Sequence, residues 1–259
     1  MTNIKENSAF KQKLKYFVKS ILFLSTIKQL RNLKKSKDSL LIYKNLTTKE
    51  VFTKIYEEGV WGKSEDPNQK YFSGGGSHDA EIVKPYIESI QKFLSSFEAK
   101  PNVVDLGCGD FFIGSKTRSL CASYTACDIV QPLIDFNKEK YRTLNVDFRV
   151  LDLTKDELPQ ADIAFIRQVL QHLSNEQILK AIPQISSKYK YLVLTEHLPS
   201  THDFIENLDK PAGPDIRFDK NSGVVLTSPP FNLAIKKQKQ LCQFSLYGGL
   251  ISTTLYTLK

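Results

Sequence analysis

Short apolar runs alternate with helix-length amphipathic segments through the second half of the chain. The apolar runs predict five strands, at 102–106, 124–129, 147–151, 162–166 and 191–195. The segments between them predict one helix that reaches about Cys121, a second at 132–144, and a third at 174–185 with Ser174 as its N-cap. This alternation is typical of βαβ units, so we expect an α/β protein with a doubly wound, mainly parallel sheet.

Two further features follow the fifth predicted strand. Residues 197–238 hold five of the 11 prolines and are too long for a bare connection, which predicts a cap insert. Residues 241–246 and 250–258 lie on either side of Gly248-Gly249 and predict a closing antiparallel hairpin.

Helical periodicity also marks the first hundred residues. It predicts helices at 46–60, capped by Thr47 or Thr48, and at 80–97, with three consecutive glycines between them at 74–76. We therefore expect a basic N-terminal segment (1–45), a helical lid on the substrate side (46–100) and a core domain (101–259).

The basic segment has helical spacing of its own. Its apolar centre, 16–27, is only 12 residues long and contains Lys19, whereas a helix that crosses a bilayer needs about 20 apolar residues. Two interpretations stay open. The segment is either an interfacial helix on an anionic membrane leaflet or a helix that docks on its own domain with a solvated basic face.

Charge and cysteine content narrow the classes of partner. The formal net charge is +8, but residues 1–50 hold 12 Lys and Arg against 3 Asp and Glu, and the other residues hold 24 against 25. The main body is therefore not expected to bind nucleic acid. The four cysteines form no C-x-x-C pair, so we expect no metal site and a reducing, cytoplasmic location, with contact to the inner membrane face through residues 1–40 as an added option.

The strongest chemical motif is the glycine turn after the first predicted strand. In Asp105-Leu106-Gly107-Cys108-Gly109-Asp110 the glycines let the backbone approach a ligand at a helix start. Phe112 stands where a dinucleotide site has its third glycine, and the two aspartates would repel a pyrophosphate but suit a cation. S-adenosylmethionine carries an ammonium and a sulfonium and no phosphate, and Asp128 follows at the distance of a ribose-binding carboxylate.

On these residues the chain resembles the class I S-adenosylmethionine-dependent methyltransferases from about Val103 to Leu258. The resemblance implies a Rossmann-like fold, with Asp128 on the ribose and Asp152 near the adenine amino group, although Asp152 could instead cap its own loop. The cofactor-binding residues that it implies are Asp105, Gly107, Cys108, Gly109, Asp128, Ile129, Asp152, Leu153 and Gln168.

A second, less specific resemblance concerns the acceptor. Residues 165–173 resemble the R-x-V-L-x-H-L segment of small bacterial methyltransferases, which we associate with surface-glycan modification. Residues 222–231, Trp61-Gly62 and the glycine loop resemble other parts of that subgroup. The match implies that Gln168 and His172 lie near the methionine moiety and the acceptor.

Several side chains are candidates for the chemistry of the acceptor. His172, then His197, could act as the general base that a hydroxyl acceptor requires. Trp61, His78, Arg167 and Arg217 could bind the acceptor, the arginines through a bidentate fork on an anionic group. For each of these residues, packing, capping or an ion pair is the competing interpretation.

We therefore expect a methyltransferase that O-methylates a carbohydrate or polar surface-glycan intermediate. The alternatives are a methyltransferase of a small metabolite, a lipid or RNA, and a non-catalytic module that binds S-adenosylmethionine. A dehydrogenase is disfavoured by Phe112.

Overall fold

The computed structural model describes residues 41–201, 203–246 and 248–259. By its internal contacts the chain divides into two compact units, Met1–Lys44 and Asn45–Lys259. The predicted basic helix lies outside the described residues. Within the part of the chain that the structure describes, none of the helices combines the length and the apolar character that crossing a bilayer requires.

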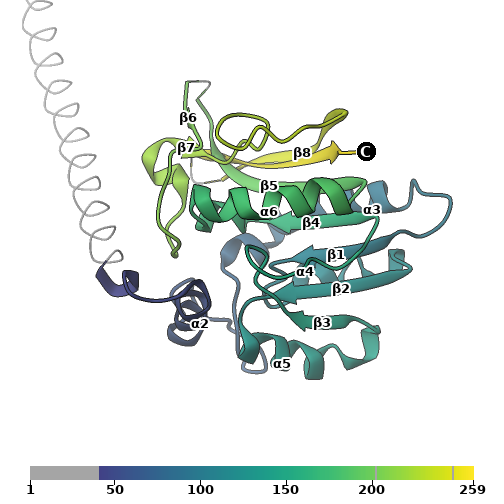
Figure 1. Cartoon of the computed structure of the whole chain (residues 1–259). Coiled ribbons are helices and arrows are strands. Elements are labelled where there is room, and N and C mark those ends of the chain that lie inside the picture. The colour runs from purple at the N-terminus through teal and green to yellow at the C-terminus, as the bar shows by residue number, and fades with distance from the viewer. Residues whose placement is uncertain (1–40, 202, 247) are drawn as a thin grey trace, which may run out of the picture. The chain divides into compact units, whose positions relative to one another are not determined.

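The larger unit is built on a seven-stranded sheet with the order β3-β2-β1-β4-β5-β9-β8 (Figure 1). Strands β1 to β5 pair in parallel, and β9 pairs antiparallel with both β5 and β8. The predicted parallel sheet with a closing antiparallel hairpin is therefore confirmed. The strands are β1 (Asn102–Leu106), β2 (Ser123–Asp128), β3 (Asp147–Val150), β4 (Ile163–Arg167), β5 (Tyr191–Pro199), β8 (Lys237–Leu246) and β9 (Gly249–Thr257).

Helices and short turns connect these strands. The α-helices are α2 (Thr48–Glu58), α3 (Ala80–Leu94), α4 (Phe112–Ser115), α5 (Gln131–Lys140) and α6 (Asn175–Lys188). The 3₁₀ turns are η1 (Gly75–Ser77), η2 (Arg118–Leu120), η3 (Arg142–Leu144), η4 (Leu170–His172) and η5 (Arg217–Lys220), and β6 (Ile205–Glu206) pairs with β7 (Ser222–Gly223). Both predicted caps form complete capping boxes, Thr47 with Glu50 on α2 and Ser174 with Gln177 on α6.

One predicted helix is much shorter than the sequence pattern indicates. The segment that reaches Cys121 contains only the four residues of α4 and the turn η2. The side chains of Ser115 and Thr117 bond the carbonyls of Phe112 and Gly114 three residues back, and such bonds compete with a continuing helix. Phe111, which precedes α4, also has a left-handed backbone with φ 59°.

The cap insert is also shorter than predicted. β9 pairs with β5 from Tyr191↔Thr257 to Pro199↔Gly249, so β5 continues past Thr195. β8 begins at Lys237, and the insert therefore covers residues 200–236.

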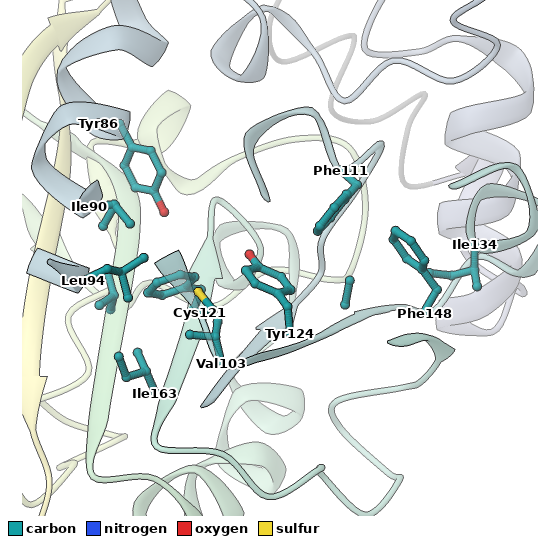
Figure 2. Close-up of a cluster of buried hydrophobic side chains, with 13 residues drawn as sticks. Tyr86, Ile90, Leu94, Val103, Phe111, Cys121, Tyr124, Ile134, Phe148 and Ile163 are labelled. Atoms are coloured by element: carbon teal, nitrogen blue, oxygen red, sulfur yellow. The ribbon is translucent and has the colours of Figure 1, made fainter. Parts of the chain in front are cut away.

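The core beneath the glycine turn is rich in aromatic rings (Figure 2). Phe111, fully buried, meets Tyr124, Tyr141 and Phe148 edge-on, with ring centroids 5.4, 5.2 and 4.9 Å away. Edge-to-face geometry of this kind stabilises beyond the area that it buries. Because Phe111 follows the turn directly, the core fixes the turn in place.

Candidate functional site

The glycine turn closes the carboxyl end of β1. The amides of Gly107 and Cys108 both donate to the carbonyl of Cys127, each at 2.8 Å. Gly107 has φ 83°, and a Cβ there would lie 2.4 Å from Cγ2 of Val169. Both the backbone angle and the lack of space therefore require glycine at position 107.

Asp128 lies at the end of the neighbouring strand and braces the turn. Its Oδ2 accepts a bond from the amide of Gly109 and its Oδ1 one from the amide of Val130, both at 3.1 Å. Burial raises the pKa of Asp128 to about 6, and these amide bonds act in the opposite direction. Ile129, half-buried, follows it. The carboxylate that the sequence assigns to the ribose therefore lies beside the turn.

Asp105 lies within β1, below the turn. It accepts a bond from the hydroxyl of Tyr124 at 3.0 Å, and burial raises its pKa to about 7. Asp110 lies above the turn and accepts the amide of Phe112 at 3.2 Å. Three carboxyl groups thus surround the turn, a donor set that fits a cationic ligand better than a phosphate.

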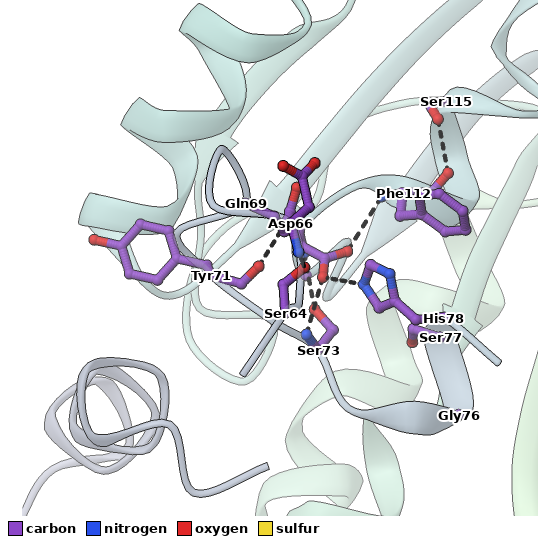
Figure 3. Close-up of polar contacts among 12 residues, drawn as sticks. Ser64, Asp66, Gln69, Tyr71, Ser73, Gly76, Ser77, His78, Phe112 and Ser115 are labelled. Atoms are coloured by element: carbon purple, nitrogen blue, oxygen red, sulfur yellow. Dashed lines mark hydrogen bonds and ion pairs between the residues drawn. The ribbon is translucent and has the colours of Figure 1, made fainter. Parts of the chain in front are cut away.

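Residues 72–78 cover the turn from the lid side (Figure 3). Ser73 and Asp110 exchange two bonds at 2.9 Å, from the Ser73 amide to Oδ2 and from the Asp110 amide to the Ser73 hydroxyl. Nε2 of His78 lies 2.6 Å from the same Oδ2, and its ring is stacked between Phe72 and Phe112. His78 therefore holds the lid to the turn in this structure.

Tyr56 is a second lid contact, and neither Tyr56 nor Ser73 belongs to a motif that predicted a site residue. The Tyr56 hydroxyl lies 3.0 Å from that of Ser73. A Cβ at Gly109 would lie 2.4 Å from the Ser73 hydroxyl and 3.2 Å from that of Tyr56. The second glycine of the turn is therefore needed for the approach of the lid.

The glycine loop of the lid meets the end of β4. Arg167 donates to the Ser77 hydroxyl at 3.0 Å and to the Gly76 carbonyl at 2.5 Å, and it stacks on Tyr86. Gln168 has φ 55°, and a Cβ at Gly76 would lie 2.8 Å from its Oε1. Arg167 therefore positions the loop, and Gln168 lies against it.

His172 lies where lid and cap meet. Its ring contacts Trp61, with centroids 5.0 Å apart, and the Trp61 indole donates to the Pro214 carbonyl at 3.5 Å. Nδ1 of His172 lies 3.2 Å from the carbonyl of Gly213, and its Nε2 lies 3.4 Å from the side-chain amide nitrogen of Gln171. Because a carbonyl can only accept a hydrogen bond, the proton of the ring is on Nδ1. Burial, aided by Lys210, lowers the pKa of His172 to about 3, so the ring is neutral.

Lys210 is a buried cation that the sequence analysis did not single out. Its ammonium donates to the carbonyls of Pro211 at 2.7 Å and His172 at 3.3 Å. Burial, strengthened by the nearby Arg217, lowers its pKa to about 7. A lysine among prolines in a predicted insert carries no signal of burial.

Two other predicted site residues, His197 and Arg217, have structural partners. His197 stacks on Phe218 with a 4.4 Å centroid distance and lies 3.1 Å from the Leu246 carbonyl. Arg217, fully buried, bonds Leu208, Leu170 and Asn175, which ties the cap to the start of α6.

Asp152 caps its own loop, the competing interpretation of this residue. Its Oδ1 accepts the amide and the hydroxyl of Thr154 at 2.9 and 2.7 Å, and Leu153 is buried beside it. No group of three His, Cys, Asp or Glu side chains that could hold a metal occurs among the described residues.

Residues 103–190 match a family model described as a methyltransferase domain. The chain therefore contains a methyltransferase domain. The match runs from Val103 in β1 to Lys190, the residue before β5, and includes the glycine turn and Asp128. Among curated proteins no sequence matches the chain significantly.

Solved structures share the fold of this methyltransferase at low identity. The N-methyltransferase NodS from Bradyrhizobium japonicum, in complex with S-adenosylhomocysteine, has a TM-score of 0.52 at 14% identity, covering 69% of this chain and 88% of its own. Magnesium protoporphyrin IX methyltransferase from Synechocystis, with bound S-adenosylmethionine, has 0.52 at 14%, covering 82% and 97%. TehB from Haemophilus influenzae has 0.50 at 16%, covering 74% and 67%.

Proposed function

We propose that this methyltransferase transfers the methyl group of S-adenosylmethionine to a hydroxyl of a carbohydrate or polar surface-glycan intermediate. The observation that supports S-adenosylmethionine as the cofactor is the glycine turn surrounded by Asp105, Asp110 and Asp128. The carboxyl groups of these residues suit a cationic nucleoside. The glycan class is supported by the resemblance of residues 165–173 and by the half-buried Trp61 ring beside His172.

Different residues of the site would bind different parts of the cofactor. Asp128 would hold the ribose hydroxyls, and the turn with Gln168 would hold the methionine part. When bound, the cofactor supplies an electrophilic methyl group on a sulfonium. The lid, held by Ser73, His78 and Arg167, would exclude water and keep the acceptor in line with that methyl group, which is a large part of the acceleration in such a displacement.

His172 is our candidate for the acceptor hydroxyl. With its proton on Nδ1, the lone pair of His172 is on Nε2, where it faces the side-chain amide of Gln171 in this structure. An acceptor hydroxyl would take the place of that amide and donate to Nε2. Its lowered pKa makes it a weak base that stays neutral, so it would orient the hydroxyl and take its proton only as the new bond forms. RNA as the acceptor is disfavoured by the nearly neutral charge of residues 51–259.

A labelling experiment tests the function. The protein is incubated with S-adenosylmethionine that carries a radioactive methyl group and with a fractionated glycan-precursor extract, and the product is identified by mass spectrometry and NMR. We expect an O-methyl sugar from the wild type and from Asp147→Asn, an exposed control on β3, and much less from Asp128→Asn. Label found only in RNA, protein or lipid would contradict the glycan assignment. Tight cofactor binding without turnover would favour the non-catalytic module.

A further inference from the structure

A polar pocket of about 270 Å³ lies on the sheet, lined by β5, β9, β8 and the cap. It is formed from residues that the cofactor turn and the lid contacts do not use. Such a volume is slightly below the range of about 300–1,000 Å³ typical of small-molecule sites, so it suits a single ring.

The strand register explains how the pocket forms. Gln238, Gln240 and Gln243 of β8 stand directly opposite Tyr256, Thr254 and Ser252 of β9. A β-bulge between Gln240 and Cys242 shifts the alternation, so that Gln243 lies on the same face as Gln240. The other face carries Leu241, Cys242 and Leu255, which pack on the core with α3. The hairpin therefore presents these three glutamines on one side only, the side away from the core.

Glu196 on β5 stands opposite Ser252 of β9, which itself stands opposite Gln243 of β8. It is 2% exposed, and neither carboxyl oxygen has a hydrogen-bond partner of good geometry among the described residues. Burial raises its pKa to about 8, an effect that Arg217 and the amides of Leu170 and Gln171 reduce. A buried carboxyl group that lacks a hydrogen bond of good geometry costs free energy, and a ligand would gain affinity from it if the side chain turned toward the pocket.

The lining selects the ligand. Amides and hydroxyls each donate and accept, as sugar hydroxyls do, and Leu194, Leu198, Val224 and Val225 supply an apolar floor for ring C–H groups. Among the described residues, no lysine or arginine lines the pocket to pair with an anion. A cation would pair only with Glu196, after that buried carboxyl had lost its proton.

We propose that this pocket binds a neutral polyhydroxylated ring, one sugar unit, outside the cofactor site. Its role as the place that holds a second unit of the acceptor rests on the proposed function. The binding itself does not, because it requires no methyl transfer.

The test is a titration of the ¹⁵N-labelled full-length protein, saturated with S-adenosylhomocysteine, with the neutral methyl glycosides of glucose, rhamnose and N-acetylglucosamine. We expect at least one of them to shift the side-chain amide signals of Gln238, Gln240 and Gln243 saturably, whereas glucuronate does not. The double variant Gln240→Ala/Gln243→Ala, which alters exposed side chains, should weaken binding about tenfold or more. Lys239→Ala, which lies between Gln238 and Gln240 along β8 and does not line the pocket, should bind as the wild type does.

Glu196→Gln and Glu196→Leu form a second pair. The glutamine keeps a neutral hydrogen-bonding group and should retain binding, whereas the leucine should lose it. Amide signals that do not respond to any neutral sugar, or that respond equally in the double variant, would overturn the proposal. If sugars bind here but no glycan is methylated, the proposed function is wrong and the proposed sugar site is supported. If a glycan is methylated but no sugar binds here, only the proposed sugar site is wrong.

Discussion

At the scale of single residues, the candidate site is held together by contacts between side chains that lie far apart along the chain. Asp128 was predicted from its spacing and lies beside the glycine turn, as expected. The lid contacts of His78 and the buried bonds of Arg217 depend on residues 32 and up to 47 positions away in the chain, which no local pattern encodes. No sequence motif assigned Tyr56, Ser73 or Lys210 to the site, because their partners are defined only by the fold.

Asp128→Asn should weaken the binding of S-adenosylhomocysteine by about 1.5–3 kcal/mol, the usual worth of hydrogen bonds to a charged group. The asparagine keeps the shape of the side chain but removes the charge and turns one acceptor into a donor. Isothermal titration calorimetry measures the loss, with Asp147→Asn as the control. Unchanged affinity would show that this carboxylate does not hold the ribose.

Gly107→Ala should destabilise the fold by about 1–3 kcal/mol, because it forces a Cβ onto a left-handed backbone and against Val169. Adding Val169→Ala should restore the stability that is lost through steric overlap with Val169, but not the stability that is lost through the backbone angle of φ 83°. Urea denaturation of the single and double variants measures both. Full recovery would mean that only space, and not the backbone angle, requires glycine here.

Glu196 gives a prediction for pH. The pKa of its carboxyl is about 8 in the folded state and has the ordinary value near 4.5 in the unfolded chain. The unfolded chain therefore releases the proton first, and stability falls as the pH rises between these two values. Glu196→Gln should raise the melting temperature more at about pH 8 than at about pH 5. An equal effect at both pH values would show that the carboxyl is not held protonated.

At the scale of elements, the sequence predicted the capping boxes and the alternation of strands and helices. It did not predict where α4 ends early or where β5 is extended. Thr47 with Glu50 and Ser174 with Gln177 are local signals, and both helices begin where they predict. The early end of α4 depends on side-chain bonds by Ser115 and Thr117. The length of β5 depends on pairing with β9, 50 or more residues later. These outcomes are decided by competition and by long-range pairing.

The lid is the element whose contacts can be separated by substitution. His78→Phe keeps a ring between Phe72 and Phe112 but removes the bond to Asp110, whereas His78→Ala removes both. We expect cofactor dissociation to become faster in His78→Phe and faster still in His78→Ala, measured by stopped-flow displacement. Ser96→Ala, an exposed site after α3, is the control. Identical rates in all variants would show that the lid does not retain the cofactor.

At the scale of the whole molecule, positive charge and methyltransferase core belong to different parts of the chain. The excess of Lys and Arg is confined to residues 1–50, and the unit Asn45–Lys259 has its own sheet and core. We infer that the basic segment directs the protein to an anionic partner and takes no part in the reaction.

Removal of residues 1–40 tests this inference. Co-sedimentation with vesicles that contain anionic phosphatidylglycerol should fall, because each basic residue near such a surface contributes about 1 kcal/mol. The affinity for S-adenosylhomocysteine should stay the same. Vesicle binding that survives the truncation would place the membrane contact, if any, in the methyltransferase unit.

The position of β9 between β5 and β8 has a consequence for how the chain folds. β8 pairs with β9 alone within the sheet, so it joins the sheet only when β9 has paired with β5. Pairing across so many residues is slow compared with local contacts. The cofactor turn depends on β1, β2 and β4, which precede this step. A newly made chain should therefore gain its cofactor site first, and the row of glutamines on β8 should become a surface that can select a sugar only when the last strand is in place.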